Sequence, residues 1–437
     1  MERAPRTSGP ESRRTTGRDR RLRILIGTDT YPPDVNGAGY FTHRLATGLA
    51  ERGHDVHVVC ASEEGAPGIG YDGEVTLHRL RSASVLVHPT MRTAVPLGVA
   101  GHVARLMDRL APHVVHAQSH FTVSRATVRQ GRISGTPVVL TNHFMPDNLF
   151  AHAHIPERLQ GLAGRLAWRD MVRVANEADY VTTPTRRAAE LLAQKGYERP
   201  VEAVSCGIDL ERFHPRPAER TAARTGFGLP DRETMAFVGR LDEEKRIDEL
   251  IRALPLVHEE RDLQLVLAGT GQREGELREL AAGLGVADRV HFLGFVPDEE
   301  LPRVYVAADL FAIGSIAELQ SIATLEAMST GLPVVAADAL ALPHLVDHGR
   351  NGYLYRPGDV AGLADRLLAV LRSGREAMGA ASREIALTHD HRRSLARFEE
   401  IYTQVRPTLY GPRGLVPGRA ASPAGRPARP RRHPVPA

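Results

Sequence analysis

Two hydrophobic patterns alternate along most of the chain, and together they predict an α/β fold. Short apolar runs such as LRILIGTD, residues 22–29, are bounded by turn residues, which is typical of buried parallel strands. Between them lie longer segments with apolar residues three and four positions apart, which is the spacing of one helix face. The order strand, loop, helix, strand recurs in both halves of the chain, which indicates two Rossmann-like units.

The clearest of these units covers residues 311–335. An apolar strand is followed by a short loop with Glu318 and by a helix that begins near Ser321. Gly331 ends that helix, because glycine readily takes the left-handed conformation found after helix C-termini. Open parallel sheets bind ligands beyond the carboxyl ends of their strands. Glu318 and the start of the helix are therefore predicted to border a ligand site, with the helix start suited to phosphate.

Length and composition fit a globular protein of two domains. The chain has 437 residues, with 42% hydrophobic and 25% charged residues, whereas both ends are rich in Arg and lack apolar periodicity. The predicted division is a basic extension at 1–21, a first Rossmann-like domain at 22–210, a second at 211–385, a C-terminal helix at 386–410 and a basic tail at 411–437.

Several kinds of protein are disfavoured by what the sequence lacks. Cys60 and Cys206 are the only cysteines, which fits a reducing cytoplasm better than a disulfide framework. The N-terminus has no apolar core of a secretory signal, and no run of about 18 uncharged apolar residues is present. His113 and His116 fall on opposite faces of a strand, and no Asp-x-Asp motif occurs, so we expect no metal.

Candidate phosphate and ribose contacts occur in both halves. Arg240 and Lys245 lie on the loop after the first strand of the second half, where a guanidinium fork and a point charge would neutralise a diphosphate. Gly37 and Gly39 would let the backbone approach an anion closely at a helix start. Glu326 has two oxygens that can accept from both hydroxyls of a ribose. The alternatives are a solvated charged loop, a plain turn and a helix-surface glutamate.

The spacing of two glutamates carries a family resemblance. Glu318, seven residues, and Glu326 followed by AMSTGLPVVA resemble the E-x7-E motif of retaining glycosyltransferases of family 4. That family has the GT-B fold, in which two Rossmann-like domains face a central cleft and the last helix crosses back onto the first domain. The resemblance covers residues 22–405. The chain departs from the family where Leu319-Gln320-Ser321 replaces a usual Gly, and where Cys206 replaces a usual Asn.

The resemblance implies roles for individual residues. His143, at the end of the strand TPVVLTNH, would face the donor sugar, Arg240 and Lys245 would hold the departing diphosphate, and Glu318 would hold sugar hydroxyls. These four are the predicted catalytic residues. The predicted donor-binding residues are Gly37, Ala38, Gly39, Gly271, Phe295, Val296, Leu319, Gln320, Ser321, Ile322 and Glu326.

The implied reaction is transfer of a hexose from a UDP- or GDP-linked sugar to a hydroxyl, with retained anomeric configuration and no metal cofactor. The segments TNHFMP and ELQSIATLEAM are most similar to members that glycosylate diacylglycerol or phosphatidylinositol. We therefore expect a lipid acceptor and a peripheral association with an anionic membrane surface on the cytoplasmic side. A soluble acceptor and a nucleotide-sugar epimerase of the same fold stay open. A non-enzymatic nucleic-acid-binding module is disfavoured by the intact motif set.

Two basic segments of the first half fit such a surface. The predicted helix at 156–176 bears Arg158, Arg165, Arg169 and Arg173 in one stripe, bordered by leucines. A second segment, residues 84–110, combines apolar residues with Arg92, Arg105 and Arg109. Basic residues beside apolar ones suit an anionic bilayer, although a core helix with a solvated edge has the same pattern.

Overall fold

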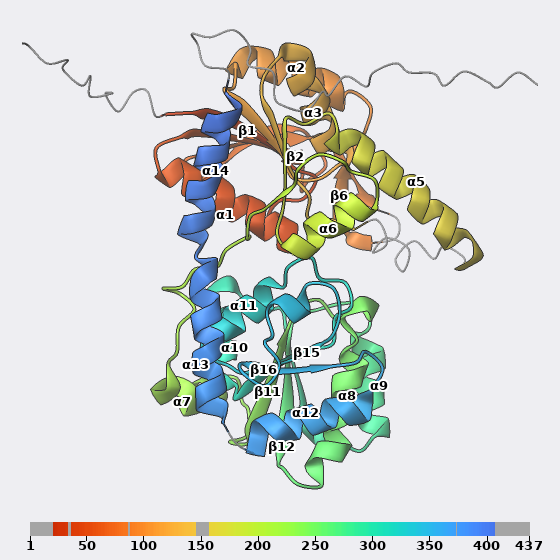
Figure 1. Cartoon of the computed structure of the whole chain (residues 1–437), viewed down its shortest axis with the longest axis vertical. Coiled ribbons are helices and arrows are strands. Elements are labelled where there is room, and N and C mark those ends of the chain that lie inside the picture. Colours follow the sequence, from red (N-terminus) through yellow and green to blue (C-terminus); the bar gives the residue numbers. More distant parts are fainter. Residues whose placement is uncertain (1–20, 34–35, 86–87, 146–156, 373, 407–437) are drawn as a thin grey trace, which may run out of the picture.

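The computed structural model describes residues 21–33, 36–85, 88–145, 157–372 and 374–406, and these form two α/β domains, one above the other in Figure 1. The N-terminal domain is built on an eight-stranded sheet of order β10-β9-β8-β7-β1-β2-β4-β3. All neighbouring strands pair in parallel except β3, which is antiparallel to β4. Its strands are β1 (Arg23–Gly27), β2 (Asp55–Ala61), β3 (Gly68–Asp72), β4 (Val75–Leu80), β7 (Val114–Ala117), β8 (Val138–Thr141), β9 (Tyr180–Thr183) and β10 (Glu202–Ala203).

Helices cover both faces of this sheet, and a separate hairpin lies beside it. The helices are α1 (Gly37–Glu51), α2 (Val99–Leu110), α3 (Thr122–Ser134), α5 (Glu157–Ala175) and α6 (Arg186–Gln194), and the hairpin joins β5 (Ser82–Val85) to β6 (His88–Ala94). Alternate residues of β1 face different layers: Ile24 and Ile26 pack in the same apolar cluster as Phe398, whereas Leu25 packs with Trp168. Both faces are therefore buried, which explains the continuous apolar run in the sequence.

The C-terminal domain has a six-stranded parallel sheet of order β13-β12-β11-β14-β15-β16. Its strands are β11 (Glu233–Val238), β12 (Leu263–Ala268), β13 (Val290–Gly294), β14 (Leu310–Ile313), β15 (Val334–Ala337) and β16 (Gly352–Tyr355). Its helices are α7 (Arg220–Gly226), α8 (Ile247–His258), α9 (Glu274–Gly283), α10 (Leu301–Ala307), α11 (Ile322–Ser329), α12 (Val360–Arg372) and α13 (Arg375–Ala386). This pair of Rossmann-like domains confirms the predicted fold class.

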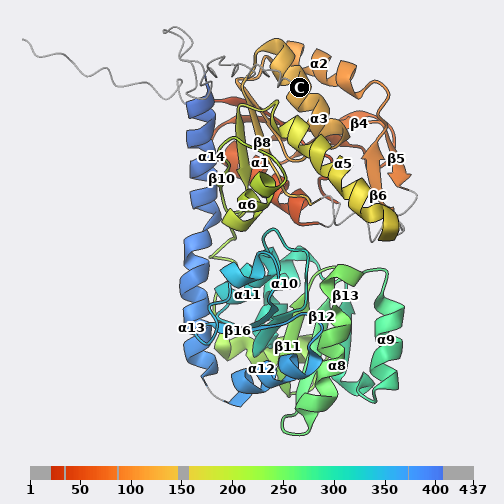
Figure 2. The ribbon, with the colours of Figure 1, turned by 45° about the vertical axis from the view of Figure 1, so that its right-hand side comes forward.

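The last helix, α14 (His391–Val405), continues in line with α13 and lies against the N-terminal domain (Figures 1 and 2). Phe398 and Tyr402 are buried in the same apolar cluster as Phe41 of α1. The Tyr402 hydroxyl also lies 2.7 Å from Nδ1 of His116, whose Nε2 is 2.6 Å from the Thr141 hydroxyl. His116 therefore joins α14 to the first sheet.

The first strand is shorter than predicted: it ends at Gly27 and not at residue 29. Asp29 leaves the sheet and caps α3: its carboxylate accepts from the backbone N–H groups of Val123, at 2.8 Å, and Ser124, at 3.2 Å. These N–H groups have no partner within the helix.

Two features bear on the predicted environment of the protein. Among the described residues, no helix combines the length and apolar character needed to cross a bilayer. In the same part of the chain, no three His, Cys, Asp or Glu side chains gather as ligands for a metal ion. The basic segments 1–20 and 407–437 lie outside the described residues.

Candidate active site between the facing edges of the two sheets

The two sheets direct their carboxyl ends toward each other, and the helix starts that follow β1 and β14 meet there. A Cβ built on Gly37, the first residue of α1, would lie 3.9 Å from Cδ1 of Ile322, the first residue of α11. The α1 start is closed by Asn36, whose side chain accepts from the Gly39 N–H at 2.8 Å. The predicted loop Gly37-Ala38-Gly39 thus faces the second domain, but the Gly39 N–H already has a partner.

Lys245 and Glu318 form an ion pair at the centre of this region. Their Nζ and Oε1 atoms are 2.6 Å apart, and the side chains are only 17% and 12% exposed. The loops that carry them are also joined by the backbone, since the Ile316 N–H donates to the Glu244 carbonyl at 3.0 Å. The sequence assigned one residue to the diphosphate and the other to the sugar. The structure brings the two together as one unit.

Arg240 is held by two carboxylates that the sequence analysis did not consider. Its guanidinium contacts Asp242, and its Nη2 donates to Oε1 of Glu244 at 2.9 Å. Both acids are largely buried, whereas Arg240 is 34% exposed. A guanidinium has five N–H donors in a fixed plane, so this grip orients the side chain and leaves donors for a ligand. The spacing of Asp242 and Glu244, two and four residues after Arg240, was visible in the sequence.

Glu326 lies on α11 and is 8% exposed. Its Oε2 accepts a hydrogen bond from the hydroxyl of Tyr305 on α10 at 2.9 Å. Burial raises the pKa of Glu326 from its ordinary value of 4.5 to about 7, although the charges of Arg44 and Arg212 and the Tyr305 hydrogen bond oppose the rise. The carboxyl group is therefore close to half ionised at neutral pH. Tyr305 could not be identified from the sequence, because only the fold brings it into contact with Glu326.

We expect Glu326→Gln to change how stability depends on pH. The folded protein holds a proton that the unfolded chain releases near pH 4.5, so the free energy of unfolding of the wild type falls as pH rises toward 7. The variant has no carboxyl group to titrate at this position. Relative to the wild type, its free energy of unfolding should therefore rise by on the order of 2 kcal/mol between about pH 5 and about pH 8. Urea unfolding of both proteins at both pH values measures it. An equal difference at the two pH values would contradict the raised pKa.

His143 follows β8 and is half-buried, with Phe41, Gln118 and Cys206 as neighbours of its ring. Its ring centre lies 4.6 Å from that of Phe41, with the two ring planes tilted by 49°. Its Nε2 lies 3.1 Å from Oε1 of Gln118, and its Nδ1 lies 4.0 Å from Sγ of Cys206. Burial lowers the pKa of His143 to about 3 and raises the pKa of Cys206 to about 12. The ring is therefore neutral, with Nε2–H donating to Gln118 and the thiol donating to Nδ1. A neutral ring of this kind positions neighbouring groups and does not supply a charge.

The loop between Glu318 and α11 holds the two domains together. The hydroxyl of Thr185, at the start of α6, donates to the Leu319 carbonyl at 2.8 Å, and the Leu319 side chain packs in an apolar cluster of the N-terminal domain. Oε1 of Gln320 accepts from the Cys206 N–H at 2.7 Å. The side chains of these two predicted donor-binding residues are thus engaged by the first domain, so they would reach a donor only through their backbone.

The remaining predicted residues line the same edge of the second sheet. Ser321 caps α11 by accepting from the Thr324 N–H at 3.3 Å. Position 271 requires glycine for packing, because a Cβ there would lie 2.4 Å from the backbone nitrogen of Leu241. Phe295 follows β13 and is 59% exposed, with Val296 beside it. An exposed aromatic side chain at a strand end offers a flat surface to a planar ligand.

Comparison with protein families matches both halves of the chain. Residues 35–212 match the family described as Glycosyltransferase Family 4, and residues 232–373 match Glycosyl transferases group 1. The two matches lie on the two Rossmann-like domains and leave out residues 1–34, 213–231 and 374–437.

Individual relatives span most of the chain. A Mycobacterium tuberculosis protein named GDP-mannose-dependent alpha-(1-6)-phosphatidylinositol monomannoside mannosyltransferase is 34% identical over 382 residues, covering 83% of this chain and 93% of its own. A Nocardia farcinica D-inositol 3-phosphate glycosyltransferase is 32% identical over 364 residues, covering 77% of each chain. Among solved structures, sucrose-phosphate synthase from Thermosynechococcus elongatus aligns over 88% of this chain and 99% of its own, with a TM-score of 0.72 at 19% identity.

Proposed function

The chain belongs to the family 4 glycosyltransferases with the GT-B fold, and from that premise we propose that it moves a hexose from a nucleoside-diphosphate sugar to a hydroxyl of a membrane lipid, with retention of anomeric configuration. The observation that carries the proposal is the buried Lys245–Glu318 pair beside Arg240, at the carboxyl ends of β11 and β14. Cations and a carboxylate at this edge suit a ligand that joins a sugar to phosphates.

In the proposed mechanism the two cations act on the leaving group. Breaking the bond between the anomeric carbon and the phosphate oxygen builds negative charge on the diphosphate and positive charge on the sugar. Arg240 and Lys245 stabilise the diphosphate, an electrostatic role that does not require a metal. Glu318 binds hydroxyls of the sugar, and Glu326, when ionised, accepts from the ribose hydroxyls.

The acceptor oxygen attacks on the face that the diphosphate leaves. One bond forms between the acceptor oxygen and the anomeric carbon as the carbon–oxygen bond to the diphosphate breaks. The acceptor proton passes to the departing phosphate oxygen, so no protein base is needed and configuration is retained. His143, neutral and fixed by Gln118, positions the sugar-facing wall of the site.

The names of the two relatives support different acceptors. The mycobacterial protein acts, by its name, on a phosphatidylinositol monomannoside, which supports a lipid acceptor and GDP-mannose as donor. The Nocardia protein is named for D-inositol 3-phosphate, so a soluble inositol phosphate is the second candidate. We favour the lipid because the mycobacterial match covers more of both chains.

The test combines donor binding with product analysis. GDP-mannose and UDP-glucose are first compared by thermal shift, because a ligand that binds the folded state raises the melting temperature. The better donor is then incubated with phosphatidylinositol, diacylglycerol, inositol 3-phosphate or no acceptor, with and without EDTA. We expect a glycolipid of unchanged anomeric configuration in the presence of EDTA. Transfer to inositol 3-phosphate alone, an epimer without acceptor, or loss of activity in EDTA restored by Mg²⁺ would each overturn the corresponding part of the proposal.

A further inference from the structure

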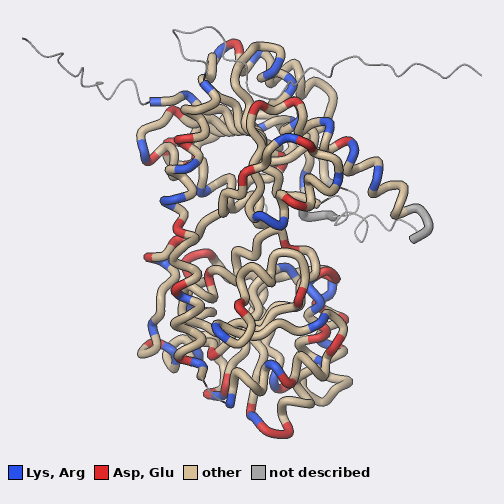
Figure 3. The backbone as a smooth tube through the Cα atoms, viewed as in Figure 1, with Lys and Arg blue, Asp and Glu red and all other residues tan. Residues whose placement is uncertain are grey.

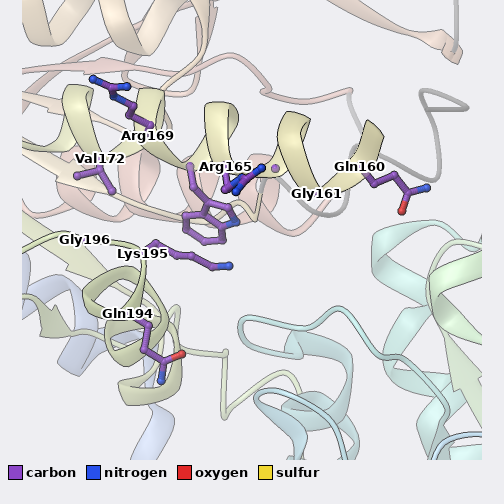
Figure 4. Close-up of a pocket in the computed structure, with 10 residues that line it drawn as sticks. Gln160, Gly161, Arg165, Arg169, Val172, Gln194, Lys195 and Gly196 are labelled. Carbon is purple, nitrogen blue, oxygen red and sulfur yellow. The ribbon is translucent and has the colours of Figure 1, made fainter. Parts of the chain in front are cut away.

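A groove lies between α5 and the end of α6 in the N-terminal domain (Figure 4). Its volume is about 630 Å³, enough for a lipid headgroup. The groove is lined by Gln160, Gly161, Gly164, Arg165, Trp168, Arg169, Val172, Gln194, Lys195 and Gly196. The buried indole of Trp168 forms its wall, and Nζ of Lys195 lies 5.2 Å from the centre of that ring. Among the described residues that line the groove, three are cations and none is acidic.

Three cations of α5 in its described part are exposed to solvent. Arg165, Arg169 and Arg173 lie on one face of the helix, and none of the ion pairs formed between described residues includes them. Figure 3 shows Lys and Arg positions recurring along α5. In Figure 4 the head group of Arg169 turns away from Lys195, whose Nζ lies over the Trp168 ring that lines the groove. Arg165 and Lys195 are therefore the cations best placed for a ligand inside the groove.

Apolar side chains border these cations on the same helix face. Leu162 and Leu166 lie one turn apart, and these two large apolar side chains are 52% and 58% exposed. An exposed pair of leucines beside cations suits the interface of a bilayer, where leucines pack among the acyl chains and cations contact the anionic headgroups. The helix lies on the side of the N-terminal domain away from α14 in both Figure 1 and Figure 2.

The helix α2 of the second basic segment is described along its whole length and lacks the groove and the exposed leucine pair found at α5. The hollow on α2 is smaller, about 370 Å³, and is lined by His102, Arg105, Asp108 and Arg109. Asp108 lies among the cations there and weakens the attraction for an anion. Leu106 and Met107 of α2 are buried, so this helix presents no leucine pair to a bilayer. Arg105 and Arg109 are nevertheless exposed and four residues apart, which makes them a matched reference for α5.

We propose that the α5–α6 groove binds the phosphate headgroup of an anionic membrane phospholipid between Arg165 and Lys195, with Leu162 and Leu166 inserted among the acyl chains. This inference rests on the proposed function in one respect: it gives an enzyme with a lipid acceptor its docking surface. The headgroup phosphate exchanges its hydrogen bonds to water for hydrogen bonds from the two cationic side chains. The Trp168 indole excludes solvent from one side of this contact.

Flotation with two kinds of vesicle tests the groove. The full-length protein is mixed at low salt with vesicles of phosphatidylcholine alone or of an equimolar mixture with phosphatidylglycerol. We expect binding to the mixed vesicles only. The double variant R165Q/K195Q should bind them about 30-fold more weakly, because each cation near an anionic surface contributes roughly a fivefold factor. The matched variant R105Q/R109Q should lose much less, and an equal loss would assign binding to diffuse charge and overturn the site.

A second variant blocks the groove without removing a cation. A Cβ on Gly161 would meet nothing within 4 Å, so Gly161→Glu adds a carboxylate inside the groove at no cost in packing. It should weaken vesicle binding at least 10-fold, since two like charges repel at close range. Gly101→Glu on α2 is the matched control and should bind nearly as the wild type does. Unchanged binding by Gly161→Glu would show that the groove is not occupied.

Two further arms separate the possible failures. In the first, inorganic phosphate and chloride are compared at equal ionic strength for their ability to release the protein from the vesicles. A much stronger release by phosphate would assign the groove to a soluble phosphate and overturn the membrane assignment. Thermal shift by the nucleotide sugar should be the same for all groove variants. If no nucleotide sugar shifts the wild type, the proposed function fails. If donors bind but R165Q/K195Q floats like the wild type, the groove alone fails.

Discussion

Replacing Arg240 by alanine is expected to lower kcat about 100-fold or more without unfolding the protein. The guanidinium is the exposed member of a group with Asp242 and Glu244, and it faces the edge of the sheet where we place the diphosphate. Removing one preorganised charge from a developing anion costs about 10²- to 10³-fold in kcat. The variant also removes a cation from beside two largely buried carboxylates, and their repulsion of the diphosphate adds to the loss.

Two variants of the same domain serve as controls. Arg240→Lys keeps the charge, but an ammonium cannot be gripped in a plane by two carboxylates, so an intermediate loss is expected. Arg252→Ala removes an exposed arginine of α8 whose ion pair with Asp248, at 3.7 Å, lies on the helix surface, and kcat should not change. Initial rates at saturating donor measure all three. Turnover at the wild-type rate by Arg240→Ala would remove this residue from the leaving-group site.

The fold and the family were within reach of the sequence because their signals are local. The apolar run of β1 and the Glu318–Glu326 spacing each occupy only a few consecutive residues, and the alternation of strands with helix-spaced segments is visible one stretch at a time. The GT-B fold and family 4 membership predicted from them are confirmed. The end of β1 was wrong by two residues, because Asp29 bonds to Val123 and Ser124, which lie more than 90 residues away.

Contacts made only by the fold could not be predicted in this way. Thr185 and Leu319 are 134 residues apart, and Lys245 and Glu318 are 73 apart, so no local pattern indicates that either pair touches. The β3–β4 hairpin was also missed, since its edge strand β3 is mostly exposed and has no apolar run. The roles assigned to the single residues of the site stay predictions for the same reason.

The closeness of Lys245 and Glu318 leads to the second large effect. We expect Lys245→Gln and Glu318→Gln each to lower kcat about 100-fold, because each removes a group that the transition state uses. Each also leaves the partner charge uncompensated where the side chains are at most 17% exposed, which destabilises the fold. Two residues that acted independently would give a double variant about 10,000-fold slower. For a single unit, the double variant should be little slower than either single variant and more stable than both.

A double-mutant cycle at saturating donor, with melting temperatures for all four proteins, decides between these outcomes. The ion pair of Arg261 with Glu233 is the matched control, since Nε and Oε2 are 2.9 Å apart at the amino end of β11, away from the site. Arg261→Gln and Glu233→Gln should change stability slightly and kcat not at all. Multiplicative losses at Lys245 and Glu318 would restore the separate roles that the sequence indicates. A shared loss would mean that the lysine binds the diphosphate while holding the carboxylate that binds the sugar, so the bond to be broken lies between the two halves of one ion pair.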